Sequence, residues 1–130
     1  MEPLQQIERT ELWVKDKLDG EGTGHDWHHI HRVTTQAKEI AEIEGADVFI
    51  VTLAALLHDL IDDKVVVSEE EGLKEVTNWL EEIGTTVEQR NHILTIITTM
   101  SFKGGNNEPV TTLEAQVVQD ADRGGESSFL

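Results

Sequence analysis

Histidine and aspartate side chains gather in three short segments of the chain. The segments are GHDWHHIHRV at residues 24–33, which holds four of the six histidines, LLHDLIDDK at residues 56–64 and VVQDADR at residues 117–123. The chain has no cysteine, so a transition-metal site would have to be built from imidazole and carboxylate groups. The three segments supply both kinds of group.

His58 and Asp59 end an apolar run, where two ionisable side chains are costly to bury unless they are paired or bind a metal ion. Adjacent helical residues point about 100° apart, so both can reach one ion only if it lies between helices. In the alternative, His58 caps the helix C-terminus and Asp59 faces water. Asp120 taken alone would be an exposed or capping residue. It becomes a candidate ligand only in the company of the other two.

His25, Asp26 and His29 spell H-D-x-x-H, which differs by one carboxylate from the H-E-x-x-H of zinc proteases. A protease site would need a further ligand such as Glu42 or Glu44. It would also leave the second and third segments unused, which counts against it.

The hydrophobic period predicts the helices that must position these residues, at 3–19, 26–44, 46–60, 68–83, 87–101 and 113–123. Residues 46–60 are apolar almost all round, which predicts a buried central helix. Capping boxes and terminal glycines support the boundaries: Ser68 with Glu71, Thr86 with Gln89, Thr111 with Glu114, Gly45 and Gly84. The fold class is therefore all-α, with about six helices in one domain.

The charge of the chain limits its partners. Ten Lys and Arg residues against 26 Asp and Glu give a net charge of −16, which repels nucleic acids and anionic membranes. The sequence shows no signal peptide and no long apolar run, so we expect a soluble, cytoplasmic protein. A phosphorylated small molecule could still bind if a metal ion or a few Lys and Arg side chains were placed at its site.

In order along the chain, the segments resemble the HD-domain metal-dependent phosphohydrolases, whose ligands run H, H-D and D on successive helices. They are most similar to a small bacterial subgroup with the motifs GHDWxHIxRV, LLHDxIDDK, SFKGG and QDADR, found here at residues 24–33, 56–64, 101–105 and 119–123. The resemblance implies that one divalent cation is bound by four ligands: His29, His58, Asp59 and Asp120. Mn²⁺ and Mg²⁺ are the first choices of ion, with Fe²⁺, Co²⁺ and Ni²⁺ as alternatives.

The resemblance further implies hydrolysis of a nucleotide, with pyrophosphate release from a nucleoside triphosphate as its most specific form. Water activated by the metal ion would attack phosphorus, and Asp62 or Asp63 would orient that water or protonate the leaving oxygen. Lys64, Arg32 and Lys103 would neutralise the substrate phosphates.

Other residues of the motifs have two interpretations each. His25 and Asp26 match the subgroup and are expected to line the substrate side or support the ligands. His92 is either a core histidine or a substrate contact. Trp27 is expected in the core rather than as a base-stacking platform, and His28 and His31 are expected on the surface.

We expect an HD-type domain over residues 1–123 and a short atypical tail over residues 124–130. Members of the subgroup continue after QDADR with LDAIG and further helices, whereas this chain reads GGESSFL after Arg123. The apolar faces left exposed would favour a homo-oligomer. The alternative to an active hydrolase is a catalytically weak metal- or nucleotide-binding helical module.

Overall fold

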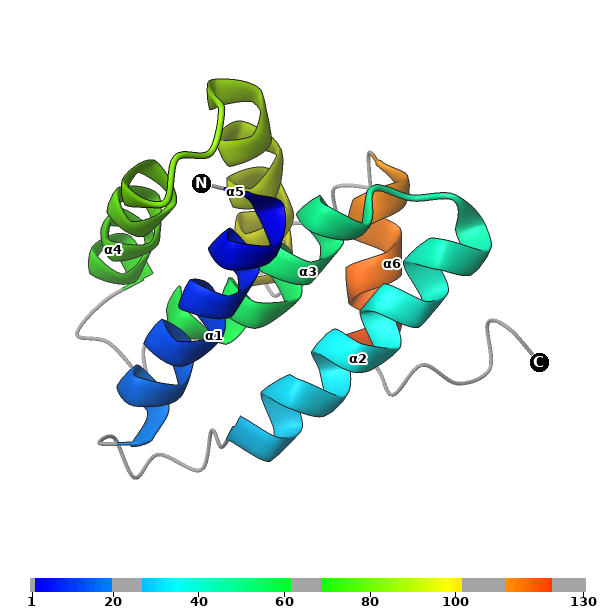
Figure 1. Cartoon of the computed structure of the whole chain (residues 1–130), viewed down its shortest axis with the longest axis horizontal. Helices are drawn as coiled ribbons and strands as arrows, with labels where there is room; N and C mark the ends of the chain where they lie inside the picture. The colour runs from blue at the N-terminus through cyan, green and yellow to red at the C-terminus, as the bar shows by residue number, and fades with distance from the viewer. Residues whose placement is uncertain (1, 20–26, 62–68, 102–111, 123–130) are drawn as a thin grey trace.

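Six α-helices make up most of the described chain. The computed structural model describes residues 2–19, 27–61, 69–101 and 112–122. The helices are α1 (Pro3–Asp19), α2 (Trp27–Glu44), α3 (Val48–Leu57), α4 (Glu69–Glu82), α5 (Val87–Ser101) and α6 (Leu113–Asp122), with a short 3-10 helix, η1 (His58–Ile61), directly after α3 (Figure 1). No β-strand occurs in these four ranges. The predicted all-α fold of about six helices is confirmed.

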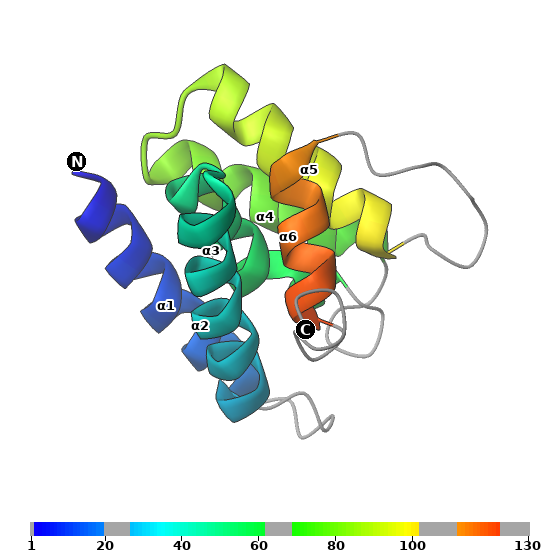
Figure 2. The same ribbon diagram turned by 90° about the vertical axis from the view of Figure 1, so that its right-hand side faces the viewer.

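Helix α3 is the centre of the domain. Its residues 50–57 are all buried, as expected for a helix that is apolar almost all round. Helices α1, α2, α5 and α6 pack against it, and the two ribbon views show it enclosed between them (Figures 1 and 2). Since each fully buried Leu or Ile side chain contributes about 1.5–3 kcal/mol, α3 fixes the position of whatever lies at its two ends.

Several predicted helix ends are confirmed. The Thr86 N–H donates to Gln89 Oε1 at 2.9 Å, and the Gln89 N–H donates to Thr86 Oγ1 at 3.0 Å. This reciprocal pair is the predicted capping box at the start of α5. Gly45 and Gly84 follow α2 and α4 with φ of 81° and 85°. Glycine adopts this left-handed conformation without the steric cost that a Cβ would bring.

The start of α6 differs from its prediction. Thr111 and Ser68, which were expected to cap α6 and α4, lie outside the described residues. At α6, the Oγ1 of Thr112 accepts a hydrogen bond from the Ala115 N–H at 3.1 Å. The carboxylate of Glu114 bonds to Asp47, at the start of another helix.

The apolar segment 46–60 forms a shorter α-helix than predicted. The α-helix ends at Leu57, and His58 begins the 3-10 turn η1. A 3-10 helix has three residues per turn, so adjacent side chains are about 120° apart rather than 100°. His58 and Asp59 therefore lie on a tight turn at the end of the buried helix.

Side chains also join α1 to α4. The rings of Trp13 and Trp79 stack with centroids 4.7 Å apart and planes 4° apart, and the Trp79 Nε1–H donates to Thr10 Oγ1 at 2.9 Å. The buried Gln6 donates from Nε2 to the Ile83 carbonyl at 2.8 Å. These contacts hold the first helix onto the domain.

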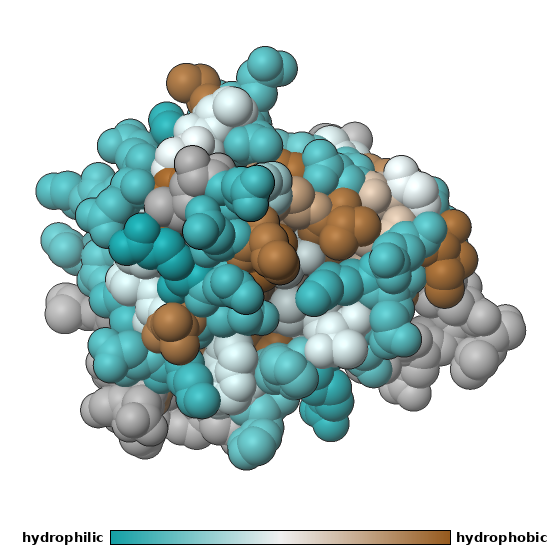
Figure 3. Space-filling model, viewed as in Figure 1, coloured by the Kyte–Doolittle hydropathy of each residue, from teal (hydrophilic) through white to brown (hydrophobic). Residues whose placement is uncertain are grey.

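The visible surface is mainly hydrophilic. Figure 3 shows teal residues over much of one face, with hydrophobic residues gathered near its centre. Among the large hydrophobic residues that the structure describes, Ile43 is the most exposed, at 79%. Among the described helices, none is both long enough and apolar enough to cross a membrane.

Candidate metal centre

His58 lies almost fully buried at the junction of α3 and η1, with 5% of its surface exposed. Its Nδ1 lies 2.6 Å from the Ala55 carbonyl oxygen. A carbonyl oxygen can only accept, so Nδ1 carries a proton and donates it. This hydrogen bond fixes the ring orientation and turns Nε2 toward the carboxylates nearby.

Two carboxylates face the Nε2 atom of His58. Asp59 Oδ1 lies 3.1 Å from it and Asp122 Oδ1 lies 3.2 Å from it. Asp122 Oδ1 also lies 3.9 Å from His29 Nε2 on α2. We call these four residues the donor cluster: His29, His58, Asp59 and Asp122. Three elements far apart in sequence, α2, η1 and the end of α6, bring it together.

The surroundings of His58 change its pKa. Burial lowers the pKa of His58, but the hydrogen bond with Asp122 and the negative charges of Asp59 and Asp122 outweigh that effect, with a further contribution from the Ala55 carbonyl. The net result is a raised pKa. The two carboxylates therefore favour the protonated form of this imidazole.

The two aspartates of α6 lie on different sides of that helix. Residues two apart on an α-helix point about 200° apart, so Asp120 and Asp122 cannot both face His58. Asp122 makes the contacts, whereas Asp120 is buried at 8% exposure and no hydrogen bond or ion pair joins it to any other described residue. Sequence reasoning missed Asp122. Its spacing of four and seven residues from the buried Val118 and Ala115 could have revealed it.

Of the predicted substrate contacts near the cluster in sequence, Arg32 is the one within the described residues. It is exposed on α2 and one turn after His29, so the two side chains are neighbours on the helix surface. The remaining predicted residues of the second, third and fourth motifs, and those before α2, fall outside the described ranges: His25, Asp26, Asp62, Asp63, Lys64 and Lys103. Their roles stay predictions.

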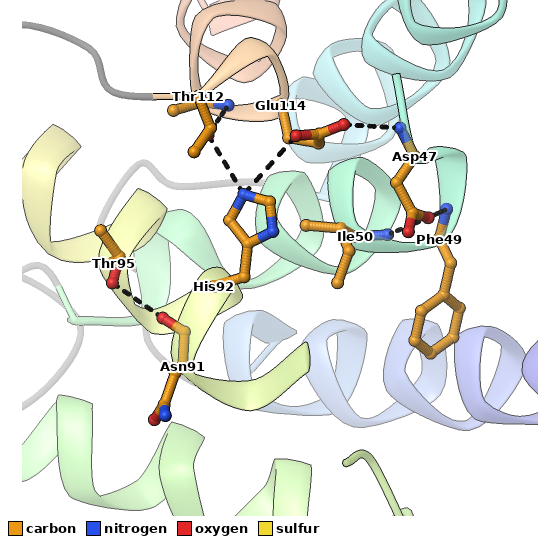
Figure 4. A network of polar contacts seen from close by, with 9 residues as sticks. Asp47, Phe49, Ile50, Asn91, His92, Thr95, Thr112 and Glu114 are labelled. Atoms are coloured by element: carbon orange, nitrogen blue, oxygen red, sulfur yellow. Dashed lines mark hydrogen bonds and ion pairs between the residues drawn. The ribbon is translucent and has the colours of Figure 1, made fainter. Parts of the chain in front are cut away.

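His92 lies at the other end of α3 from His58. Its Nε2 is 3.1 Å from Thr112 Oγ1 and 3.6 Å from Glu114 Oε1 (Figure 4). Glu114 in turn contacts Asp47, which precedes α3. The ten residues of α3 span about 15 Å. These contacts do not bring His92 to the donor cluster, and its role as a substrate contact stays a prediction.

The structure also gives the burial of the other described residues of the first motif. Trp27 is partly buried against the hydrophobic core, and His28 and His31 are exposed.

Glu42 is 13 residues from His29 on the same continuous helix, a distance of about 20 Å along its axis. The arrangement of a zinc protease is therefore not formed with this glutamate.

The donor atoms of the cluster suit a divalent cation. As the side chains stand, no group of three or more His, Asp or Glu residues in the described ranges is arranged to hold a metal ion. In an octahedral site with bonds of about 2.1 Å, adjacent donor atoms lie about 3.0 Å apart. The separations of 3.1 and 3.2 Å around His58 are close to that value, and imidazole with carboxylate is a donor set for Mn²⁺ or Fe²⁺.

Comparisons with known proteins identify similar sequences and folds. The Bacillus subtilis protein YpgQ is 43% identical over 126 residues, which cover 95% of this chain and 61% of YpgQ. The crystal structure of YpgQ in complex with ADP matches with a TM-score of 0.76 and 42% identity, covering 95% of this chain and 59% of that one. An HD-superfamily hydrolase from Bacillus thuringiensis matches with a TM-score of 0.79 and 42% identity, covering 94% and 58%.

The chain thus spans about three fifths of the length of these relatives. The family model for the HD domain matches residues 26–123, a range that begins just before α2 and ends just after α6. HD domains bind divalent metal ions, and every residue of the donor cluster lies within the match. The chain belongs to the HD domain family.

Proposed function

We propose that the donor cluster binds one divalent cation and that the chain uses it to hydrolyse a phosphate bond of a nucleotide. The observation that carries this proposal is the convergence of two carboxylates on the buried Nε2 of His58, with His29 at the open side. Asp122 takes the place that sequence analysis gave to Asp120, because, of these two aspartates, Asp122 is the one that contacts His58.

The residues at the donor cluster have different roles in this proposal. Ala55 holds the proton on Nδ1 of His58, so the other ring nitrogen faces the cluster. Asp59 and Asp122 supply the negative charge that a divalent cation would balance. When bound, the cation would polarise a phosphoryl oxygen and lower the pKa of a coordinated water. His29 is 40% exposed, so substrate can approach from its side.

A nucleotide is the proposed substrate class, with pyrophosphate release from a nucleoside triphosphate as the most specific candidate. The structure of YpgQ in complex with ADP supports the nucleotide. Arg32 supports it as well, because this exposed guanidinium lies beside His29 in a chain of charge −16 and can pair with phosphate oxygens. Asp62 and Asp63 are the proposed water-orienting residues, and Lys64 and Lys103 are proposed phosphate contacts.

A paired measurement tests this proposal. Purified protein is loaded with Mn²⁺ and dialysed, metal content is measured by elemental analysis, and phosphate and pyrophosphate release are measured on a panel of nucleoside di- and triphosphates. Asp59→Ala should lose both metal and turnover. Asp16→Ala is the matched control, because it removes an exposed carboxylate of α1.

The outcomes separate the alternatives. Metal near one ion per chain with product release supports the hydrolase, and the product identifies the bond that is cut. Metal without product release favours a metal-binding module. Unchanged metal content in Asp59→Ala would reject the donor cluster as the site.

A further inference from the structure

The backbone N–H of Asp47 has an unusual acceptor. Asp47 caps α3, and its Oδ1 accepts hydrogen bonds from the N–H groups of Phe49 and Ile50. In a capping box, a Glu or Gln three residues after the cap returns a bond to the N–H of the cap residue. In α3 that position is Ile50, which is apolar and 3% exposed. The helix therefore cannot complete its own box, as α5 does with Gln89.

Glu114 supplies the missing acceptor from α6. Its Oε2 accepts the Asp47 N–H at 2.8 Å, although the two residues are 67 positions apart in sequence. The other oxygen, Oε1, lies 3.6 Å from His92 Nε2, and the same ring nitrogen contacts Thr112, which caps α6. Figure 4 shows His92, Thr112, Glu114 and Asp47 meeting where α5, α6 and the start of α3 come together. We call these four residues the capping network.

The capping network and the donor cluster join the same two helices at opposite ends. Glu114 lies in the first turn of α6 and contacts the start of α3, whereas Asp122 ends α6 and contacts His58 at the end of α3. Between the two ends, the buried apolar side chains of α6 are those of Ala115, Val117, Val118 and Ala121. Apolar contacts are non-directional, so this surface alone does not define how far α6 advances along α3.

The hydrogen bond from the Asp47 N–H to Glu114 does define the axial position of α6 along α3. A shift of α6 by one residue moves Asp122 by about 1.5 Å along the axis. Metal–ligand distances tolerate only about 0.2 Å, so such a shift would remove Asp122 from the cluster. We infer that Glu114 is a positioning residue for the metal centre, setting the axial register of α6 on α3 so that the Asp122 carboxylate reaches His58. This inference rests on the proposed function, because it assumes that the donor cluster binds the cation.

The test is Mn²⁺ affinity, measured by isothermal titration calorimetry on variants shown to be folded by circular dichroism. Glu114→Ala should weaken Mn²⁺ binding by about 10-fold or more, the effect expected when a group supporting the ligands is lost. Glu114→Gln keeps an oxygen that accepts the Asp47 N–H and should stay close to wild type. Glu114→Asp keeps the charge but is one methylene shorter, so it should weaken binding in the same direction as Ala even if Glu114→Ala fails to fold.

Gln6→Ala is the matched control. It removes the long-range hydrogen bond that Gln6 Nε2 donates to the Ile83 carbonyl, where α1 contacts the end of α4. It should lower the melting temperature and leave Mn²⁺ affinity unchanged. The inference is overturned if Mn²⁺ affinity is the same in Glu114→Asp, Glu114→Ala and the control Gln6→Ala. The proposed function would then remain intact. Failure of the wild type to bind Mn²⁺ would defeat the proposed function first.

Discussion

Asp120 and Asp122 offer a direct test of which carboxylate completes the metal centre. We consider Asp120→Asn and Asp122→Asn, because Asn has nearly the same volume as Asp and leaves the packing of α6 in place. Asp122 Oδ1 lies 3.2 Å from His58 Nε2 and 3.9 Å from His29 Nε2, whereas Asp120 makes no hydrogen bond or ion pair with either histidine. Only Asp122→Asn should impair metal binding.

The expected size of the effect follows from linkage. A cation at 100 times its dissociation constant stabilises the folded state by about 2.7 kcal/mol. Unfolding entropy is about 2.1 cal/mol/K per residue, so for 130 residues it is about 0.27 kcal/mol/K. Saturating Mn²⁺ should therefore raise the Tm of the wild type and of Asp120→Asn by about 10 °C. If Asp122→Asn binds about 100-fold more weakly, the same Mn²⁺ concentration stabilises it by about 0.4 kcal/mol, a shift of less than about 2 °C.

Differential scanning fluorimetry with and without Mn²⁺ measures these shifts at one fixed protein concentration. Mg²⁺ and Ca²⁺ titrations in the same plates show which ions the site accepts. A full Mn²⁺ shift in Asp122→Asn combined with a lost shift in Asp120→Asn would refute the assignment from geometry and restore the ligand set predicted from sequence.

Three further predictions concern stability. The raised pKa of His58 stabilises the metal-free protein fully below about pH 6.5, the unfolded value, and this contribution is lost as pH rises through the folded pKa. The Tm of the metal-free protein should therefore fall above that pH and Mn²⁺ should restore it, whereas a pH-independent Tm would contradict the charge account. Leu56→Ala should cost about 2–5 kcal/mol in urea unfolding, because Leu56 is 1% exposed in α3; a cost under 1 kcal/mol would mean that the core closes the cavity. Gly84→Ala should cost about 1 kcal/mol, since φ is 85°, and an unchanged urea midpoint would show that the turn has relaxed.

Much of the fold could be predicted because the sequence marks its helices locally. Hydrophobic period defined all six α-helices, and the Thr86–Gln89 box and the two terminal glycines lie where predicted. The end of α3 was misplaced, because an apolar run does not distinguish an α-helix from the 3-10 turn that follows Leu57.

The donor cluster was only partly predictable, because the residue that α6 contributes depends on how this helix faces its neighbours. The motif QDADR contains two aspartates, and sequence order alone does not say which one points at His58. The partner of Glu114 was also missed. A local capping rule paired it with Thr111, whereas the structure pairs it with a backbone N–H 67 residues away. Contacts of this kind follow from the assembly of helices and leave no local signature.

The long sequence separation of the contacts between α3 and α6 connects cation binding to chain topology. The His58–Asp122 contact closes a loop of 64 positions, and a cation bridging it would stabilise the folded state across that separation, because the unfolded chain does not hold the site together. Opening of α6 alone would dissolve the centre while the other helices remained packed, so the free energy of that local opening sets an upper limit on how long an ion is retained. The measured release of the ion would then depend on the undocking of α6 alone, and it would occur before global unfolding.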